Sequence, residues 1–132
     1  MYDFMLTPEE QALKQEVRRF TREEVSSDFL RAMDKDEIVY PREFVEKLAA
    51  QNLRGIRFPK EYGGRGMSWV ADVTATEEIG CLGIALGCAF DMPSIVGEAL
   101  NTFGTEDQKE RYLRPYLAGK LVSAEADRKS VV

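Results

Sequence analysis

Apolar positions recur at helical spacing along most of the chain. Near the start this stripe consists of Leu6, Leu13, Val17 and Phe20. The segment Thr7-Pro8-Glu9-Glu10 offers a capping threonine, a proline at the first helical position and a glutamate at the third, which together form a capping box. The stripe resumes after a five-residue step and continues to Met33. We therefore predict a first helix from Pro8 to about Arg31, with its apolar face shifting near Thr21.

Two further helices are predicted from their cap and closing residues. Pro41 begins the second helix, because its fixed φ suits a first turn, and Asn52 and Gly55 close it. Asp91 can cap the fourth helix, which carries an apolar face and ends at Gly104.

The fifth predicted helix begins with another capping box, Thr105-Glu106-Asp107-Gln108. Tyr112 and Leu113 fall on its inner face, and Pro115 should disrupt it because proline removes a backbone donor. No segment alternates apolar and polar residues for long enough to predict a strand. The pattern predicts an all-α, up-and-down bundle of about five helices.

The third predicted helix runs from Trp69 to about Leu86. Along one line of positions its side chains become smaller toward the C-terminal end. This line consists of Trp69, Val73, Thr76, Gly80, Gly83 and Gly87. Glycine in a helix costs about 1 kcal/mol relative to alanine, so some interaction must compensate. Close packing of a neighbouring helix is the simpler interpretation, and close approach of a ligand is the alternative.

The segment Arg57–Met67, with the sequence RFPKEYGGRGM, separates the second and third predicted helices. Its glycines do not match the GxGxxG fingerprint of dinucleotide-binding folds, which follows a strand. It contains no Walker lysine motif for phosphate binding either. The segment is either a loop that handles a ligand or a bend that brings two helices together.

Composition limits the classes of function. The 132 residues, 44% of them hydrophobic, suffice for one domain with a core. A net charge of −5 without a basic cluster argues against nucleic-acid binding. Neither a secretory signal nor a long apolar run for a membrane span is visible. We therefore expect a cytoplasmic protein, or one inside an organelle.

The chain contains no histidine and only two cysteines, Cys81 and Cys88. Their seven-residue spacing on one continuous helix would separate them by about 10 Å, too far for a disulfide. We expect both thiols to be buried in a helix, with no metal site. Without histidine, Ser-His-Asp and Cys-His mechanisms are excluded, and the residues offer no catalytic constellation.

Three motifs in a fixed order resemble the N-terminal helical domain of the acyl-CoA dehydrogenases. The first is the G-x-x-x-P-x-x-Y-G-G-x-G run from Gly55 to Gly66. The second is FGTEDQKERYL, and the third is the P-x-L-A-G-K turn after it. The resemblance covers residues 1–125, which leaves 126–132 as a tail outside the family pattern.

The resemblance implies that Arg57–Met67 is a bend without a flavin or phosphate role. Pro59 would stiffen its entry and Tyr62 would anchor it in the core. Gly63, Gly64 and Gly66 would supply positive φ or close approach.

The family oxidises acyl-CoA thioesters with FAD, a glutamate base and, commonly, electron-transfer flavoprotein as electron acceptor. By resemblance this domain forms one wall of the acyl pocket, made of Gly87, Cys88, Asp91, Met92 and Ile95. Glycine leaves room for a chain, and Met92 and Ile95 give apolar contact. Asp91 either caps a helix or meets a polar acyl tail. No catalytic or cofactor-binding residue is assigned to this chain.

The sequence departs from the family after SAEA, where DRKSVV replaces the entry into a flavin-binding domain. We therefore expect a truncated, inactive domain without its own cofactor, as a gene fragment or an excised domain. An apolar face around Trp69, Met92 and the Gly80–Gly87 surface should be exposed and favour self-association. The alternatives are a helical protein-interaction module and an acyl-chain-binding domain without catalysis. The length of the acyl chain cannot be predicted from this sequence.

Overall fold

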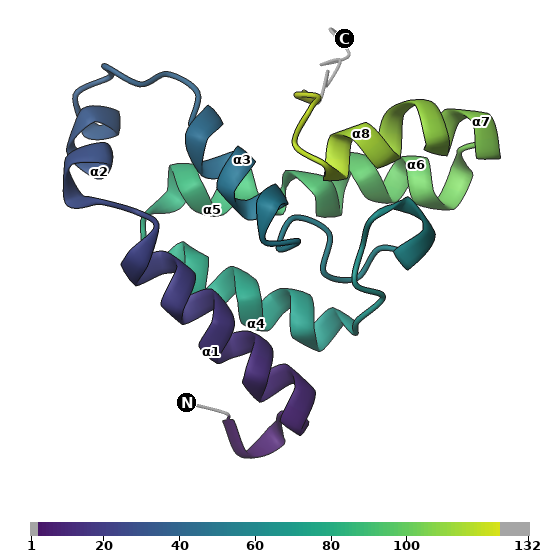
Figure 1. Cartoon of the computed structure of the whole chain (residues 1–132), viewed down its shortest axis with the longest axis horizontal. Helices are drawn as coiled ribbons and strands as arrows, with labels where there is room; N and C mark the ends of the chain where they lie inside the picture. Colours follow the sequence, from purple (N-terminus) through teal and green to yellow (C-terminus); the bar gives the residue numbers. More distant parts are fainter. Residues whose placement is uncertain (1–2, 125–132) are drawn as a thin grey trace, which may run out of the picture.

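The computed structural model describes residues 3–124, which form helices joined by loops (Figure 1). Within that range it contains no strand, and it comprises six helices, some of them divided by π-helical turns. The all-α prediction is therefore confirmed, with one helix more than the expected five. The predicted tail at 126–132 lies outside the described residues.

The first predicted helix is in fact two helices. A 3₁₀ turn at Asp3–Met5 (η1) precedes α1, Pro8–Glu23, which begins with the predicted capping box. The chain then breaks, and α2 spans Ser27–Asp34. The break arises because the Ser26 hydroxyl accepts the Phe29 N–H and caps a new helix. The five-residue step in the apolar stripe marks this break.

Helix α3 spans Arg42–Ala50 and follows Pro41, as predicted. It ends where Asn52 adopts a left-handed conformation, with φ of 54°. Gly55 lies beyond the end of the helix, buried against Leu117. The following loop contains a 3₁₀ turn at Lys60–Tyr62 (η2).

The third predicted helix is also interrupted. Helix α4 spans Trp69–Gly80 and α5 spans Ile84–Met92. Gly83 separates them with φ of 116° and ψ of 161°, a conformation that essentially only glycine adopts. The two helices lie side by side and run in opposite directions (Figure 1). The turn thus folds the small-residue segment back on itself.

Asp91 does not cap a helix, contrary to the prediction. It lies inside α5, which continues through a π-helical turn at Pro93–Gly97 (η3) into α6, Glu98–Phe103. In that turn the Glu98 N–H bonds to the Pro93 carbonyl, five residues back. A π-helical turn contains one residue more than an α-helical turn. The apolar residues after it therefore fall on a different face, and in the sequence this change looks like the start of a new helix.

Pro115 does not disrupt the last helix either. Helix α7, Glu106–Gln108, begins with the predicted capping box and continues through a π-helical turn at Lys109–Leu113 (η4) into α8, Arg114–Leu117. The proline follows the wide turn, which relieves the clash that a normal turn would impose. Leu113 is buried as predicted, whereas Tyr112 is exposed.

Two groups of buried side chains hold the helices together. The larger lies among α1, α3, α4 and α5, where the rings of Phe20 and Phe44 pack 5.9 Å apart. The smaller joins the loop after α3 to the last helix, and consists of Phe58, Tyr62, Leu113 and Leu117. The loop therefore lies between both cores and fixes α4 and α5 relative to α7–α8.

Candidate functional site

The five residues predicted to line an acyl pocket all lie on α5 and η3. Cys88, Asp91 and Ile95 share one helix face with Ile84, at spacings of four, three and four residues. Cys88 and Ile95 are exposed, whereas Asp91 is half-buried. The opposite face of α5 is buried through Leu86 and Phe90. One helix thus presents Cys88, Asp91 and Ile95 on one face while its other face is fixed in the core.

Gly87 and Met92 are half-buried beside this face. A Cβ on Gly87 would meet the Cα of Gly80 at 3.7 Å, so the backbones of α4 and α5 approach closely there. The Thr76 hydroxyl donates to Asp91 Oδ1 at 3.4 Å, which links the two helices farther along. Close helix packing therefore explains part of the small-residue line.

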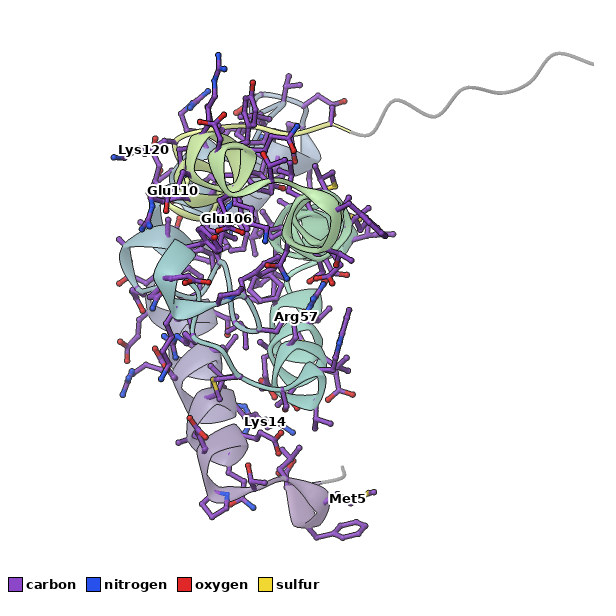
Figure 2. All side chains as sticks on the ribbon, turned by 90° about the vertical axis from the view of Figure 1, so that its right-hand side faces the viewer. Met5, Lys14, Arg57, Glu106, Glu110 and Lys120 are labelled. Atoms are coloured by element: carbon purple, nitrogen blue, oxygen red, sulfur yellow. The ribbon has the colours of Figure 1, made fainter. Side chains whose placement is uncertain are left out.

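A cluster of charged groups under this face was not predicted from the sequence. Arg57 Nε donates to Asp72 Oδ2 at 3.2 Å, and Arg57 Nη1 forms an ion pair with Glu98 Oε2. Arg57 Nη2 also donates to the Ser94 carbonyl at 3.1 Å. In Figure 2 Arg57 lies beside the teal helix α4. One buried guanidinium thereby ties the loop, α4 and the η3–α6 segment together.

The two carboxylates of this cluster respond differently to their surroundings. Burial raises the pKa of Asp72, although the Ser94 hydroxyl, at 2.7 Å, and Arg57 both favour its charged form. Burial also opposes ionisation of Glu98, but hydrogen bonds from Arg57 and Thr102 outweigh it and lower its pKa. The contacts of the cluster join the loop, α4 and the η3–α6 segment, as a structural ion network does.

Trp69 covers one face of the Arg57 guanidinium. The Arg57 Cζ lies 3.6 Å from the centroid of the indole, a close cation–π contact. Trp69 is nevertheless 60% exposed, and Val70 and Val73 are exposed beside it on α4. Trp69 and its neighbours are thus exposed, as predicted. The Arg57 guanidinium packs against one face of the indole.

The Arg57–Met67 loop uses its backbone N–H groups internally. The N–H groups of five successive residues donate to carbonyls within residues 55–60, and these donors are Gly63, Gly64, Arg65, Gly66 and Met67. Gly63 and Gly66 have φ of 95° and 65°. A phosphate cradle needs free N–H groups that converge on the ligand. These five N–H groups are therefore not free to cradle a phosphate.

Tyr62 and Arg65 fix the loop to helices on either side. The Tyr62 hydroxyl donates to Glu106, which is labelled in Figure 2, and this bond raises the pKa of Tyr62 to about 12. Arg65 makes a bidentate pair with Glu16 of α1, at 2.7 and 2.6 Å. These contacts make the segment a structural bend that positions α4 and the last helix.

An apolar hollow of about 320 Å³ lies between η1, α1 and α4. Met5, Leu6, Trp69, Val70 and Val73 contribute its apolar lining. Met5 and Lys14, which also lines it, are labelled at that end of the molecule in Figure 2. None of the predicted pocket residues lines this hollow, so it is a separate feature of the surface.

The expectation of buried cysteines was wrong. Cys81 and Cys88 are both exposed, and they lie on different sides of the break at Gly83. The continuous helix assumed in the sequence argument does not exist. Across the part of the chain that the structure describes, no group of three or more acidic or cysteine side chains could hold a metal ion. Nor does any helix there have the length and apolarity to cross a membrane.

Sequence comparison identifies the family. A profile of the acyl-CoA dehydrogenase N-terminal domain matches residues 7–120. The chain belongs to the acyl-CoA dehydrogenase family. It is 35% identical over 126 residues to the short-chain specific acyl-CoA dehydrogenase of Clostridium acetobutylicum, covering 92% of this chain and 32% of that protein.

Two further similar proteins extend this comparison. The caffeyl-CoA reductase–Etf complex subunit CarC of Acetobacterium woodii is 32% identical over 104 residues, covering 78% of this chain and 27% of that protein. The crystal structure of acyl-CoA dehydrogenase from Geobacillus kaustophilus superposes with a TM-score of 0.75 at 25% identity, covering 88% of this chain and 30% of that one. The chain therefore spans about a third of the length of these acyl-CoA dehydrogenase relatives, or less.

Proposed function

We propose that this chain forms one wall of the acyl pocket in an FAD-dependent enzyme acting on acyl-CoA thioesters. The observation that carries the proposal is the outward face of α5 and η3, where Cys88, Asp91 and Ile95 align while the other face is buried. The family relationship supplies the reaction class. The flavin and the base that removes the α-proton would belong to other domains.

The residues of this face suit an acyl chain physically. Ile95 lies on the face and Met92 beside it, and both offer adaptable apolar surface, while Gly87 beside the face has no side chain to obstruct a ligand. Asp91 already accepts a hydrogen bond from Thr76. A polar group on the acyl tail could share that carboxylate, whereas a plain alkyl tail would pass beside it.

The flavin would then be held outside the Arg57–Met67 loop. The N–H groups of residues 63–67 already donate to carbonyls within residues 55–60, which supports this proposal. We therefore propose that residues 3–124 bind no FAD and do not catalyse dehydrogenation alone. We also propose electron-transfer flavoprotein as the acceptor of the assembled enzyme, since one relative is named as a subunit of an Etf complex.

A second candidate function is aliphatic binding without catalysis. The observation that favours it is the apolar hollow of about 320 Å³ between η1, α1 and α4. A hollow lined by Leu6, Trp69 and Val73 could take an alkyl chain by burial of apolar surface alone. This candidate predicts binding at α4 rather than at α5.

One titration separates these two candidates. Octanoyl-CoA is added to the ¹⁵N-labelled protein, and amide chemical shifts are followed by NMR. The pocket-wall proposal expects shifts centred on Gly87, Asp91 and Ile95, and these should weaken in Ile95→Lys. Shifts centred on Trp69 and Val73 would favour the second candidate, and no saturable shift would reject both.

Catalysis is tested with the same preparation. We expect no reduction of an electron-accepting dye when butyryl-CoA or octanoyl-CoA is supplied together with FAD. Turnover under these conditions would overturn the proposal that flavin and base lie elsewhere. The visible spectrum of the purified protein serves as the control, because bound flavin would absorb visible light, which the protein alone does not.

A further inference from the structure

Asp91 is the only charged residue on the helix that carries the proposed acyl wall. Within Ile84–Gly97, the span of α5 and η3, no other side chain is acidic or basic. Asp91 is half-buried, and it shares its face of the helix with Cys88 and Ile95. A carboxylate that loses water beside apolar side chains is unfavourable unless a hydrogen bond or an opposite charge compensates it. The partners of Asp91 therefore decide what this face can bind.

The chain itself supplies Asp91 with little compensation. Helix α5 begins at Ile84, so Asp91 lies near the end of that helix rather than at its capping position. The Thr76 hydroxyl lies 3.4 Å from Asp91 Oδ1 but 3.0 Å from the Asp72 carbonyl oxygen, so its single proton favours the carbonyl. Among residues 3–124, no ion pair includes Asp91. One weak hydrogen bond is thus the compensation that the described residues give this carboxylate.

The buried guanidinium of Arg57 is already engaged. Its three nitrogen atoms, Nε, Nη1 and Nη2, donate to Asp72, Glu98 and the Ser94 carbonyl. Burial and, in smaller part, the negative charge of Asp91 raise the pKa of Asp72. The two carboxylates therefore lie close enough to repel each other. A cation beside Asp91 would relieve this repulsion and balance its charge.

We propose that the acyl group bound at this face ends in an ammonium group that pairs with Asp91. This inference rests on the proposed function, because it needs the acyl chain to lie along α5 and η3. An ammonium supplies a positive charge and several N–H donors at once, whereas a hydroxyl supplies one donor and leaves the charge unbalanced. A plain alkyl tail would bury the carboxylate against hydrocarbon. The substrate class is therefore an ω-aminoacyl-CoA thioester.

The apolar residues around Asp91 suit the rest of such a chain. Cys88 lies one turn before it and Ile95 one turn after it, and both side chains are exposed. Met92 is half-buried beside the same face. An aliphatic stem packs its methylene groups on apolar surface while its charged end meets a polar partner, as lysine side chains do. The face thus offers contacts to both parts of an ω-aminoacyl chain.

Paired thioesters test this inference by NMR titration of the ¹⁵N-labelled full chain. The compounds ω-aminohexanoyl-CoA and heptanoyl-CoA differ only in their last group, which is an ammonium in one and a methyl in the other. The same pair is also prepared with shorter and longer chains, which places the ammonium at several depths. An ω-hydroxyhexanoyl thioester serves as the uncharged donor.

The titrations are run on the wild type, on Asp91→Asn and on Asp107→Asn. Asp107 is the matched control, because it is an exposed aspartate on α7 and its replacement changes the net charge by the same amount. We expect the wild type and Asp107→Asn to bind the amino thioester of best-fitting length about tenfold more tightly than its alkyl counterpart, because hydrogen bonds between charged groups contribute on that scale. Asp91→Asn should lose this preference, and the shifts should include the Asp91 and Ile95 amides.

The failure of this inference differs from the failure of the proposed function. Equal binding of each pair by the wild type, with shifts on α5, overturns the ammonium inference and leaves the acyl-wall proposal standing. No saturable shift with any thioester overturns both. The wild-type comparison needs no variant, so it decides the matter even if Asp91→Asn does not fold, and Asp91→Ser then replaces that variant.

Two other outcomes also contradict the inference. A preference for the amino thioester that survives in Asp91→Asn would show that another residue binds the ammonium, so the assignment to Asp91 would be wrong. Equal affinity of the wild type for the hydroxyl and amino thioesters would show that the charge is not recognised.

Discussion

Gly64 shows how a single side chain could disrupt the bend. It packs so closely on Phe58 that an added Cβ would overlap the Phe58 carbonyl oxygen, an atom of the backbone that cannot rotate away. We expect Gly64→Ala to lower the free energy of unfolding by about 3 kcal/mol, the upper range for overpacking. Urea unfolding followed by circular dichroism measures this change.

The control for this substitution is Gly80→Ala. A Cβ on Gly80, near the end of α4, would meet no atom within 4 Å. Replacing a helical glycine there should raise the free energy of unfolding by up to about 1 kcal/mol. Equal destabilisation of the two variants would contradict the argument from close approach.

Glu10 couples stability to pH at the junction of α1 and the loop. The Ser68 hydroxyl, followed by the Thr7 backbone N–H, holds the pKa of Glu10 below its usual 4.5. Because the folded pKa is lowered, its stabilising contribution is present above pH 4.5 and is lost as the pH falls through the folded pKa.

We therefore expect Glu10→Gln to lower the Tm at pH 7 and to show a smaller further loss in acid than the wild type. Thermal melts at several pH values from about 7 to about 3 bracket this transition. Glu9→Gln is the matched control, since Glu9 is exposed on the same turn. A constant difference in Tm between Glu10→Gln and the wild type across this range would exclude Glu10 as the titrating group.

At the residue scale the sequence predicted the loop better than the ion network. The glycines of the loop are recognisable because three fall within four positions, a density typical of turns. Arg57, Asp72 and Ser94 are far apart in the sequence, and each is an ordinary polar residue in its own segment. Only the folding of α4 and η3 against the loop brings them together, so no local pattern could indicate the cluster.

At the scale of the elements, Ser26 determines where the first helical segment divides. Its hydroxyl accepts the Phe29 N–H at 3.1 Å and begins α2. We expect Ser26→Ala to cost about 1 kcal/mol of stability, the usual effect of losing a cap. Ser27→Ala, one position into the helix, should change stability by less than about 0.5 kcal/mol. Chemical denaturation distinguishes the two, and equal losses would show that the cap does not matter.

The sequence predicted where helices begin more reliably than where they break. The capping boxes at Thr7 and Thr105 are local signals, and both helix starts are present in the structure. The break at Gly83 was missed because its small-residue line also suits a continuous helix. Pro115 was misjudged because a π-helical turn before a proline leaves no clear mark in the residue pattern.

At the scale of the whole molecule, an exposed apolar surface covers parts of two helices. Trp69, Val70 and Val73 expose their side chains on α4, and Ile95 and the 84%-exposed Ile84 do so on the α5–η3 helix. Exposed apolar side chains gathered on neighbouring helices favour association. We therefore propose that another domain or a second copy of the chain covers it.

Sedimentation velocity at increasing protein concentration tests this association. We expect a shift toward dimer in the wild type and a loss of that shift in Ile84→Lys, because a charge opposes burial of the surface. Val39→Lys is the control, since Val39 is at least as exposed, at 92%, but lies in the loop between α2 and α3. Monomer at all concentrations, or dimer unaffected by Ile84→Lys, would contradict the proposal.

The π-helical turn at Pro93–Gly97 has a consequence for how the chain tolerates changes in length. Deleting one residue there would rewind the segment to a normal helix and rotate everything after it by about 100°. Glu98 would then leave Arg57, and Gly97 would leave the Phe58 ring that its missing side chain accommodates. A deletion of a single codon in this turn should therefore be more damaging than many substitutions of its residues.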